Sequence, residues 1–291
     1  MKSLDYRFLT EDDYPRLFRA FREAFADYGI DMSYLNERNL GHRWTKNGVS
    51  YGSSVGAFDG DRMVGFIVVG RDEWKGRPAA FDAGTGIVRE FRGFGVAPAM
   101  FEMAFGGLRA GGVELFVLEV LRENKAAVGT YKKLGFTVAR EFDCYRLDVG
   151  AERADGMEGG AGPPVEPVGR DLLRRFSGMA DWPPSWENSF SSLARISDEL
   201  RLYGARAGSE WAGFAAYYPG LGWITNIAVS PDFRRRGIGT RLLAGVIADL
   251  PAGTETVKVV NVDRSDPATR ALLEKFGFVI YARQYEMEMT L

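Results

Sequence analysis

Two periodicities of apolar residues divide the first half of the chain into predicted strands and helices. Alternating or continuous apolar runs predict strands, and apolar residues spaced three and four positions apart predict helices. The predicted strands cover residues 4–9, 54–58, 63–69, 79–88 and 113–121, with a closing hairpin at about 137–148. The predicted helices cover residues 14–28, 32–44, 100–108 and 125–134. We therefore expect a mixed α/β layer of about seven strands and four helices that ends near Val149.

Local signals mark the ends of several of these elements. The segment Thr10-Glu11-Asp12-Asp13 is a capping-box-like helix start, and Asn124 stands where the N-cap of the last helix is expected. Gly135 is placed to end that helix in a left-handed turn. The segment Asp59-Gly60-Asp61-Arg62 separates two strand-like runs and predicts a β-hairpin.

Two residues stand out in the last strand and helix. Glu119 is a carboxylate within the apolar run 113–121, and Tyr131 lies on the helix that follows. By spacing alone they fit structural roles, a glutamate at the rim of a sheet and a tyrosine in an amphipathic core. Only a second motif gives the pair a chemical interpretation.

That second motif is the glycine-containing stretch 87–97, IVREFRGFGVA. Arg92, Gly95 and Ala97 stand there between a predicted strand and a predicted helix. Free backbone N–H groups at a helix start, the helix dipole and a backbone without bulky side chains all favour a bound anion. We therefore expect a loop that binds a pyrophosphate.

Composition narrows the class of protein. Of the 291 residues, 46% are hydrophobic and 26% are charged, which is typical of a soluble globular protein. The net charge of −2 gives no reason to expect a nucleic-acid partner. One cysteine, Cys144, and one histidine, His42, leave neither an intramolecular disulfide nor a His/Cys metal cluster, so no metal is expected. The start of the chain lacks an apolar signal core, and no window approaches about 18 apolar residues, so we expect no membrane partner and a cytoplasmic location.

The chain contains an internal repeat. Residues 150–164, GAERADGMEGGAGPP, have the composition of a linker because they cannot bury an apolar face. Beyond them, Arg234 follows Arg92 by 142 positions, and Gly277 follows Gly135 by the same 142. A constant offset over two motifs indicates a tandem duplication. The predicted domains are therefore 1–149 and 165–291, joined by the linker 150–164.

Together the two motifs resemble those of the GNAT superfamily, the amine N-acetyltransferases that use acetyl-coenzyme A. Its Arg/Gln-x-x-Gly-x-Gly/Ala signature is matched by Arg92, Gly95 and Ala97, and its second signature by Asn124, Ala127, Tyr131, Gly135 and Phe136. The resemblance implies tandem α/β (α+β) folds, each a mixed, mostly antiparallel sheet of about six to seven strands flanked by helices. It also implies acetyl-CoA as cosubstrate and direct attack of a primary amine on the thioester in a ternary complex.

The resemblance assigns roles to particular residues. The pattern Leu118-Glu119-Val120…Asn124…Tyr131 looks most like the branch that acetylates protein N-termini, in which the strand glutamate is the general base and the tyrosine the general acid. Asp82, on the preceding strand, is the alternative base. The residues implied to contact the coenzyme are Ile87, Arg92, Gly93, Phe94, Gly95, Val96, Ala97 and Asn124 in the first copy, and Val229, Arg234, Arg235, Arg236, Gly237, Ile238, Gly239 and Thr240 in the second.

The two copies differ at the residues that carry the chemistry. The offset of 142 puts Asn261 at the position of Glu119 and Leu273 at that of Tyr131. An amide is no base and leucine has no proton to give, so the N-terminal domain is predicted to be catalytic and the C-terminal domain to lack the general acid and base. Two alternatives stay open: an active C-terminal copy, or a non-catalytic sensor that binds coenzyme A.

The sequence does not identify the acceptor or the oligomeric state, and it leaves two alternatives for each. The acceptor is either a small-molecule amine or a peptide N-terminus. The protein is either a monomer with an internal pseudo-dimer or a homodimer.

Overall fold

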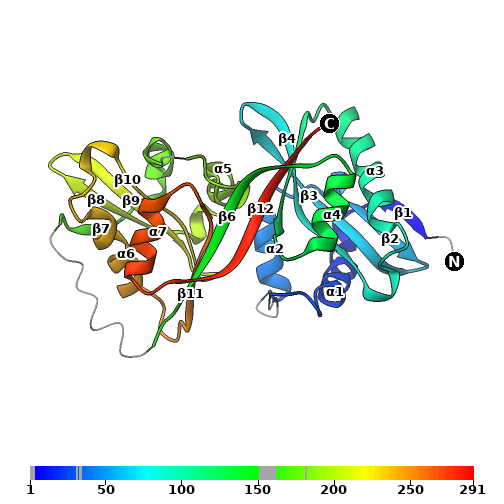
Figure 1. Ribbon diagram of the computed structural model, residues 1–291, viewed down its shortest axis with the longest axis horizontal. Helices are drawn as coiled ribbons and strands as arrows, with labels where there is room; N and C mark the ends of the chain where they lie inside the picture. Colours follow the sequence, from blue (N-terminus) through cyan, green and yellow to red (C-terminus); the bar gives the residue numbers. More distant parts are fainter. Residues whose placement is uncertain (1–3, 31, 33–34, 151–161, 181) are drawn as a thin grey trace. The chain divides into compact units, whose positions relative to one another are not determined.

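The computed structural model describes residues 4–30, 32, 35–150, 162–180 and 182–291, so most of the predicted linker lies outside the described residues. The chain forms two compact units, traced in Figure 1. Unit 1 consists of Met1–Ala139 together with Tyr285–Leu291, and unit 2 of Arg140–Gln284. The last seven residues of the chain therefore belong to the unit formed by its first half.

Unit 1 is built on a mixed sheet with the strand order β1-β2-β3-β4-β5-β12. The strands are β1 (Asp5–Phe8), β2 (Val55–Asp59), β3 (Arg62–Trp74), β4 (Arg77–Ile87), β5 (Leu115–Leu121) and the end of β12 (Val279–Thr290). The helices are α1 (Tyr14–Ala24), α2 (Glu37–Lys46), α3 (Val96–Ala110) and α4 (Lys125–Lys133). Strands β1 to β4 pair antiparallel in succession, and β4 pairs with β5 in parallel.

Several predicted local signals are present in unit 1. The capping box forms at Thr10 and Asp13, where the Asp13 carboxylate accepts the Thr10 backbone N–H at 3.0 Å. The Asn124 side chain caps α4 by accepting the Ala127 N–H at 3.1 Å. Gly135 follows α4 with φ of 103°, a left-handed conformation that glycine adopts readily. These residues determine where the elements begin and end.

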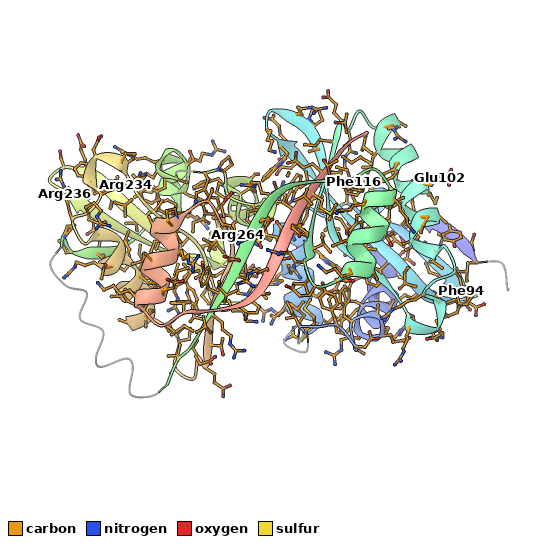
Figure 2. All side chains as sticks on the ribbon, in the orientation of Figure 1. Phe94, Glu102, Phe116, Arg234, Arg236 and Arg264 are labelled. Atoms are coloured by element: carbon orange, nitrogen blue, oxygen red, sulfur yellow. The ribbon has the colours of Figure 1, made fainter. Side chains whose placement is uncertain are left out.

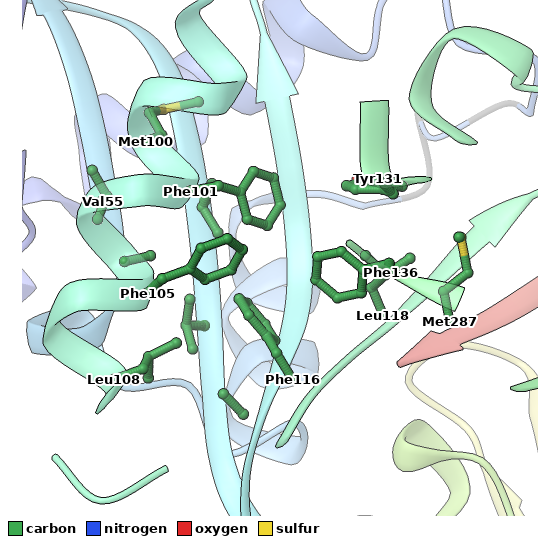
Figure 3. Close-up of a cluster of buried hydrophobic side chains, with 14 of the residues drawn as sticks. Val55, Met100, Phe101, Phe105, Leu108, Phe116, Leu118, Tyr131, Phe136 and Met287 are labelled. Carbon is green, nitrogen blue, oxygen red and sulfur yellow. The ribbon is translucent and has the colours of Figure 1, made fainter. Parts of the chain in front are cut away.

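The core of unit 1 is aromatic, as Figure 3 shows. The rings of Phe101 and Phe105 on α3 pack against Phe116 on β5 and Phe136 after α4, with centroids 5.5 to 6.3 Å apart. Met287 of β12 is fully buried in the same cluster. Burial of each such side chain stabilises the fold by roughly 1.5–3 kcal/mol, and the C-terminal strand contributes directly to it.

Unit 2 repeats this architecture with the strand order β6-β11-β10-β9-β8-β7. Its strands are β6 (Thr137–Asp148), β7 (Val165–Val168), β8 (Arg201–Ala207), β9 (Glu210–Tyr218), β10 (Trp223–Val229) and β11 (Thr256–Asp263). Its α-helices are α5 (Phe190–Ala194), α6 (Ile238–Ala248) and α7 (Pro267–Lys275), with the 3-10 helices η4 (Arg170–Met179) and η5 (Trp186–Asn188) before α5. Each unit thus holds a mostly antiparallel, six-stranded sheet flanked by helices, which confirms the predicted fold class.

Both sheets carry a β-bulge at the same place in the repeat. Asp82 pairs with Val69 and Gly84 with Val68, so Ala83 is an extra residue in β4. Thr225, 142 positions later, is the corresponding extra residue in β10. A bulge shifts the alternation of side chains by one residue, so residues on its two sides change faces of the sheet.

Some predicted boundaries are wrong. Residues 137–148 form one continuous strand, β6, rather than a closing hairpin, because their sequence contains no Gly, Pro or Asn and their partner strand β11 comes from far along the chain. The first helix stops at Ala24 instead of residue 28, and α2 begins only after its N-cap Asn36. Within the described part of the chain, no helix is long and apolar enough to cross a membrane.

Candidate functional site

The two predicted phosphate loops have the same backbone conformation. In unit 1, Gly93 and Gly95 have φ of 82° and 78°, and Gly95 is the N-cap of α3. In unit 2 the corresponding residues, Arg235 and Gly237, have φ of 62° and 78°, and Gly237 is the N-cap of α6. Left-handed residues at a helix start turn successive N–H groups toward one point, which forms an anion-binding nest.

Some side chains of these loops are buried in the core, and others are exposed to solvent. Val96 and Ile238, the first residues of α3 and α6, are each 2% exposed, so they offer a ligand only their backbone. Phe94 is 58% exposed, and Figure 2 labels it with Arg234 and Arg236 of the second loop. The predicted residues Ala97, Gly239 and Thr240 lie in the first turns of the two helices.

The arginine at the head of each loop folds back onto the preceding strand. Arg92 donates from Nε to the carbonyl of Ile87 at 2.9 Å and forms a two-pronged ion pair with Asp27, both contacts at 2.8 Å. This ion pair lowers the pKa of the Asp27 carboxyl. Arg234 repeats the first contact, donating from Nε to the carbonyl of Val229 at 3.1 Å. In unit 1 the Arg92 charge is therefore already paired, and its side chain holds the loop in place.

The central strands of unit 1 separate beside the loop. The parallel pairing of β4 with β5 ends at Asp82 and Leu118, although β4 continues to Ile87 and β5 to Leu121. A Cβ atom added at Gly84 would meet no atom within 4 Å, so the backbone there faces open space. Unpaired strand backbone carries free hydrogen-bonding groups, which suits an extended ligand that contains amides.

Glu119 and Tyr131 approach this gap from opposite faces of the sheet. Leu118 belongs to the core cluster under α3 and α4, and Tyr131 belongs to the same cluster. Side chains alternate along a strand, so the half-buried Glu119 points to the other face. Glu119 thus directly follows Leu118, the last residue of β5 that pairs with β4, and lies on the face opposite Tyr131.

Tyr131 is instead next to Asp82. The Tyr131 hydroxyl lies 3.4 Å from Oδ2 of Asp82, and both residues are only 8% exposed. Burial raises the pKa of Asp82 to about 6, although hydrogen bonds from Thr85 and Gly84 oppose the shift. Burial, together with the nearby Asp82 and Tyr28, also raises the pKa of Tyr131.

Sequence reasoning missed Thr85, a neighbour of this pair, and named the other neighbour, Tyr28, only as one of the early aromatic residues that could line an acceptor pocket. Thr85 donates its hydroxyl to Oδ2 of Asp82 at 2.7 Å. Tyr28 lies close enough for its pKa, raised chiefly by burial, to be raised further by Asp82. Neither residue belongs to a motif, and only a comparison of the two copies at the 142-residue offset would have singled out Thr85.

In unit 2, the residue that corresponds to Glu119 is Asn261, and hydrogen bonds hold its side chain on both sides. Asn261 has φ of 60° and is fully buried. Its Nδ2 donates to Oγ of Ser185 at 3.0 Å, and its Oδ1 accepts from Nε2 of Gln284 at 2.9 Å. Asn188 lies between the two central strands: its Nδ2 donates to the Val260 carbonyl at 2.9 Å, and its own carbonyl accepts from Asn226 at 3.2 Å. Ser185 and Asn188 therefore hold the segment 182–188 against β11 at this position.

A cavity of about 780 Å³ lies in unit 2, between β10 and β11. Arg234 and Arg235, just before α6, and Lys275, at the end of α7, bring positive charge to its wall. Asn226 also lines it, and its buried Oδ1 has no hydrogen-bond partner among the described residues. A nest with cations at one end and a free amide oxygen in its wall fits a ligand that has both phosphates and N–H donors.

Comparison with known proteins agrees with this geometry. N-alpha-acetyltransferase 30 of Schizosaccharomyces pombe is 30% identical over 108 residues, which cover 37% of this chain and 68% of that protein. A GCN5-related N-acetyltransferase of Sphaerobacter thermophilus has a similar fold, with a TM-score of 0.72 and 14% identity, covering 100% of this chain and 96% of that one. A tandem GNAT protein from the clavulanic acid biosynthesis pathway is similar over 99% of this chain and 98% of its own, with a TM-score of 0.72 and 15% identity. The sequence model of the acetyltransferase (GNAT) family matches residues 14–136 and again 168–278. The chain therefore belongs to the acetyltransferase (GNAT) family and contains two copies of its domain.

Proposed function

We propose that unit 1 transfers the acetyl group of acetyl-CoA to a primary amine. The observation that carries this proposal is a single site in which a glycine nest, a gap between parallel strands and a buried phenol occur together. The nest at Gly93–Ala97 would hold the diphosphate, and the unpaired edges of β4 and β5 would bind the amides of the pantetheine arm. The thioester would then lie in the gap near Tyr131.

Within this site Glu119 acts as the general base and Tyr131 as the general acid. An alkyl amine has a pKa near 10 and is mostly protonated at neutral pH, so a base that removes the proton adds about two to four decades in rate. Glu119 points to the face opposite Tyr131, which lets the amine and the leaving thiolate occupy different sides of the thioester. Asp82 faces the phenol, so it is less suited than Glu119 to serve the amine.

For unit 2 we propose binding of the coenzyme without transfer. Its nest, the cations around its cavity and the free amide oxygen of Asn226 support binding. Leu273 and Asn261 lack the acid and the base, and the hydrogen bonds of Ser185 and Asn188 hold the segment 182–188 against β11. Arg235 adds a charge at the position where the first loop has Gly93, so we expect tighter coenzyme binding in unit 2 than in unit 1.

The acceptor is proposed to be a primary amine, either a small molecule or a peptide N-terminus. The name of the yeast relative points to protein α-amino groups for that protein. A panel of small amines and short peptides distinguishes the two classes by the rate at which free coenzyme A thiol is released. A preference of at least tenfold in kcat/KM for one class would identify it.

The test of this proposal is a pair of substitutions in the full chain. Tyr131→Phe should lower kcat roughly 10- to 1000-fold with little change in the affinity for acetyl-CoA, and Glu119→Gln should lower it by about two to four decades. Matched controls are Tyr6→Phe and the exposed Glu102→Gln, which should keep wild-type turnover. Full turnover in both site variants would contradict the proposal, and coenzyme binding without any thiol release would favour a sensor.

A further inference from the structure

Asp82, Thr85 and Tyr131 form a buried, hydrogen-bonded group in unit 1. Oδ2 of Asp82 accepts from the Thr85 hydroxyl at 2.7 Å and lies 3.4 Å from the Tyr131 hydroxyl. Its other oxygen, Oδ1, accepts the Gly84 N–H at 3.0 Å. No described residue forms an ion pair with Asp82, so the carboxyl is held by neutral donors alone.

The β-bulge brings this group together. In a regular strand, residues three apart point to opposite faces of the sheet. Because Ala83 is an extra residue, Asp82 pairs with Val69 and Thr85 with Ile67, and both of these partners belong to the cluster under α3 and α4. The bulge therefore turns both polar side chains toward Tyr131.

The second copy indicates that the fold does not need this group. The offset of 142 replaces Asp82 by Ile224, Thr85 by Ile227 and Tyr131 by Leu273. Unit 2 keeps the bulge, at Thr225, and the helix that carries Leu273. All three polar members are thus absent together from the copy that also lacks Glu119. Burying a carboxyl is unfavourable, so retaining it only in unit 1 points to a chemical role.

Protonation of the departing thiolate is a step in which Asp82 has such a role. A thiol has a pKa of about 8.5, whereas burial and neighbouring groups hold the pKa of Tyr131 above its ordinary value near 10. The phenol by itself is then a weaker acid than the thiol it has to form. Asp82, with a pKa of about 6, is a stronger acid than the thiol. Tyr28 is a further titratable group near Asp82, while the paired neighbours of Asp82 on β3 and β5, Val69 and Leu118, are apolar.

We propose that Asp82 is a positioning residue that also resupplies the proton of Tyr131 during transfer. As the carbon–sulfur bond breaks and sulfur keeps the electron pair, Tyr131 gives its hydroxyl proton to sulfur, and protonated Asp82 gives its proton to the phenol oxygen. The net change is one S–H bond formed and one carboxyl O–H bond lost, with the carboxylate reprotonated from water. This inference rests on the proposed acetyl transfer in unit 1.

The experiment measures kcat and the KM for acetyl-CoA between about pH 5 and 9, with the best amine of the panel and the full-length protein. Wild-type kcat should fall as the pH rises through about 6, where Asp82 loses its proton. Asp82→Asn should lower kcat about 10- to 100-fold, leave the KM for acetyl-CoA within about twofold, and abolish that fall. Asp61→Asn, at an exposed turn position, is the matched control and should behave like the wild type.

Thr85→Val provides a second variant in case Asp82→Asn does not fold. The Thr85 hydrogen bond lowers the pKa of Asp82, so its removal should move the fall of kcat to higher pH. Wild-type kcat in Asp82→Asn, or a fall of kcat that is unchanged in both variants, would overturn the inference while leaving acetyl transfer intact. Absence of thiol release by the wild type would instead refute the proposed function, and the role of Asp82 with it.

Discussion

Asp82 is a carboxyl buried in the interior of unit 1, which is an unfavourable place for a charged group. Asp82 is buried with three hydrogen-bond partners and, among the described residues, no cation beside it. Desolvation penalises its charged form, which is why its pKa rises from 3.8 to about 6. A group whose folded-state pKa is raised stabilises the fold below its unfolded pKa, and this contribution is lost as the pH rises through the folded pKa.

The raised pKa of Asp82 makes the stability of the fold depend on pH. The free energy of unfolding of the wild type should fall by up to about 3 kcal/mol between about pH 4 and pH 7 through Asp82 alone. Asp82→Asn cannot ionise, so it should lack this fall and be the more stable protein at neutral pH. Urea unfolding of both proteins at several pH values measures the difference. Parallel stability curves for the two proteins would contradict it.

At the scale of elements, the start of a helix is the shared functional part of both copies. Gly95 and Gly237 are the N-caps of helices α3 and α6, both with φ of 78°. A Cβ atom built at Gly95 would project into open space beside the loop, where the diphosphate is proposed to bind. A larger side chain at either glycine strains the backbone by about 1–2 kcal/mol and intrudes on the ligand.

Substituting these glycines one at a time separates the two coenzyme sites. The wild type should bind two equivalents of coenzyme A in calorimetry, with the tighter site in unit 2. Gly95→Val should remove the weaker equivalent together with turnover, and Gly237→Val the tighter equivalent with turnover retained. The reverse outcome, in which Gly237→Val abolishes turnover, would identify unit 2 as the active copy.

At the scale of the whole molecule, the ends of the last strands are exchanged between the repeats. Tyr285–Leu291 belongs to unit 1, where the Leu291 N–H donates to the Glu114 carbonyl at 2.9 Å and Lys75 pairs with Glu288 at 2.5 Å. Most of β6, which follows the first repeat's last helix, pairs with β11 in unit 2. Residues 1–149 by themselves would therefore lack part of the core of unit 1.

Met287 provides the test of this exchange. Its side chain is fully buried in the core of unit 1, so Met287→Ala should reduce the free energy of unfolding by about 2–5 kcal/mol. Val279→Ala, on the same strand but 54% exposed, is the control and should stay within about 0.5 kcal/mol. Equal stabilities for the two variants would mean that the C-terminal strand does not fill this core in solution.

Features that are encoded locally or by repetition can be predicted without the structure. The Asn124 cap, the Gly135 turn and the 59–62 hairpin follow from backbone preferences of a few residues, and all three are present. The constant offset of 142 residues predicted two copies of one fold, which the family comparison confirms. The motif residues around Gly95 and Tyr131 were sufficient to predict the family.

Which side chains contact one another depends instead on how distant segments fold together. Asp82 and Thr85 lie 49 and 46 positions before Tyr131, and a bulge that no sequence motif marks turns both toward its phenol. The exchange of β6 and β12 depends on which distant strand completes each sheet, so residues 137–148 could not reveal their partner. Hydrophobic pattern and turn chemistry act over a few residues, whereas strand pairing and the burial of a carboxyl depend on segments far apart in the chain.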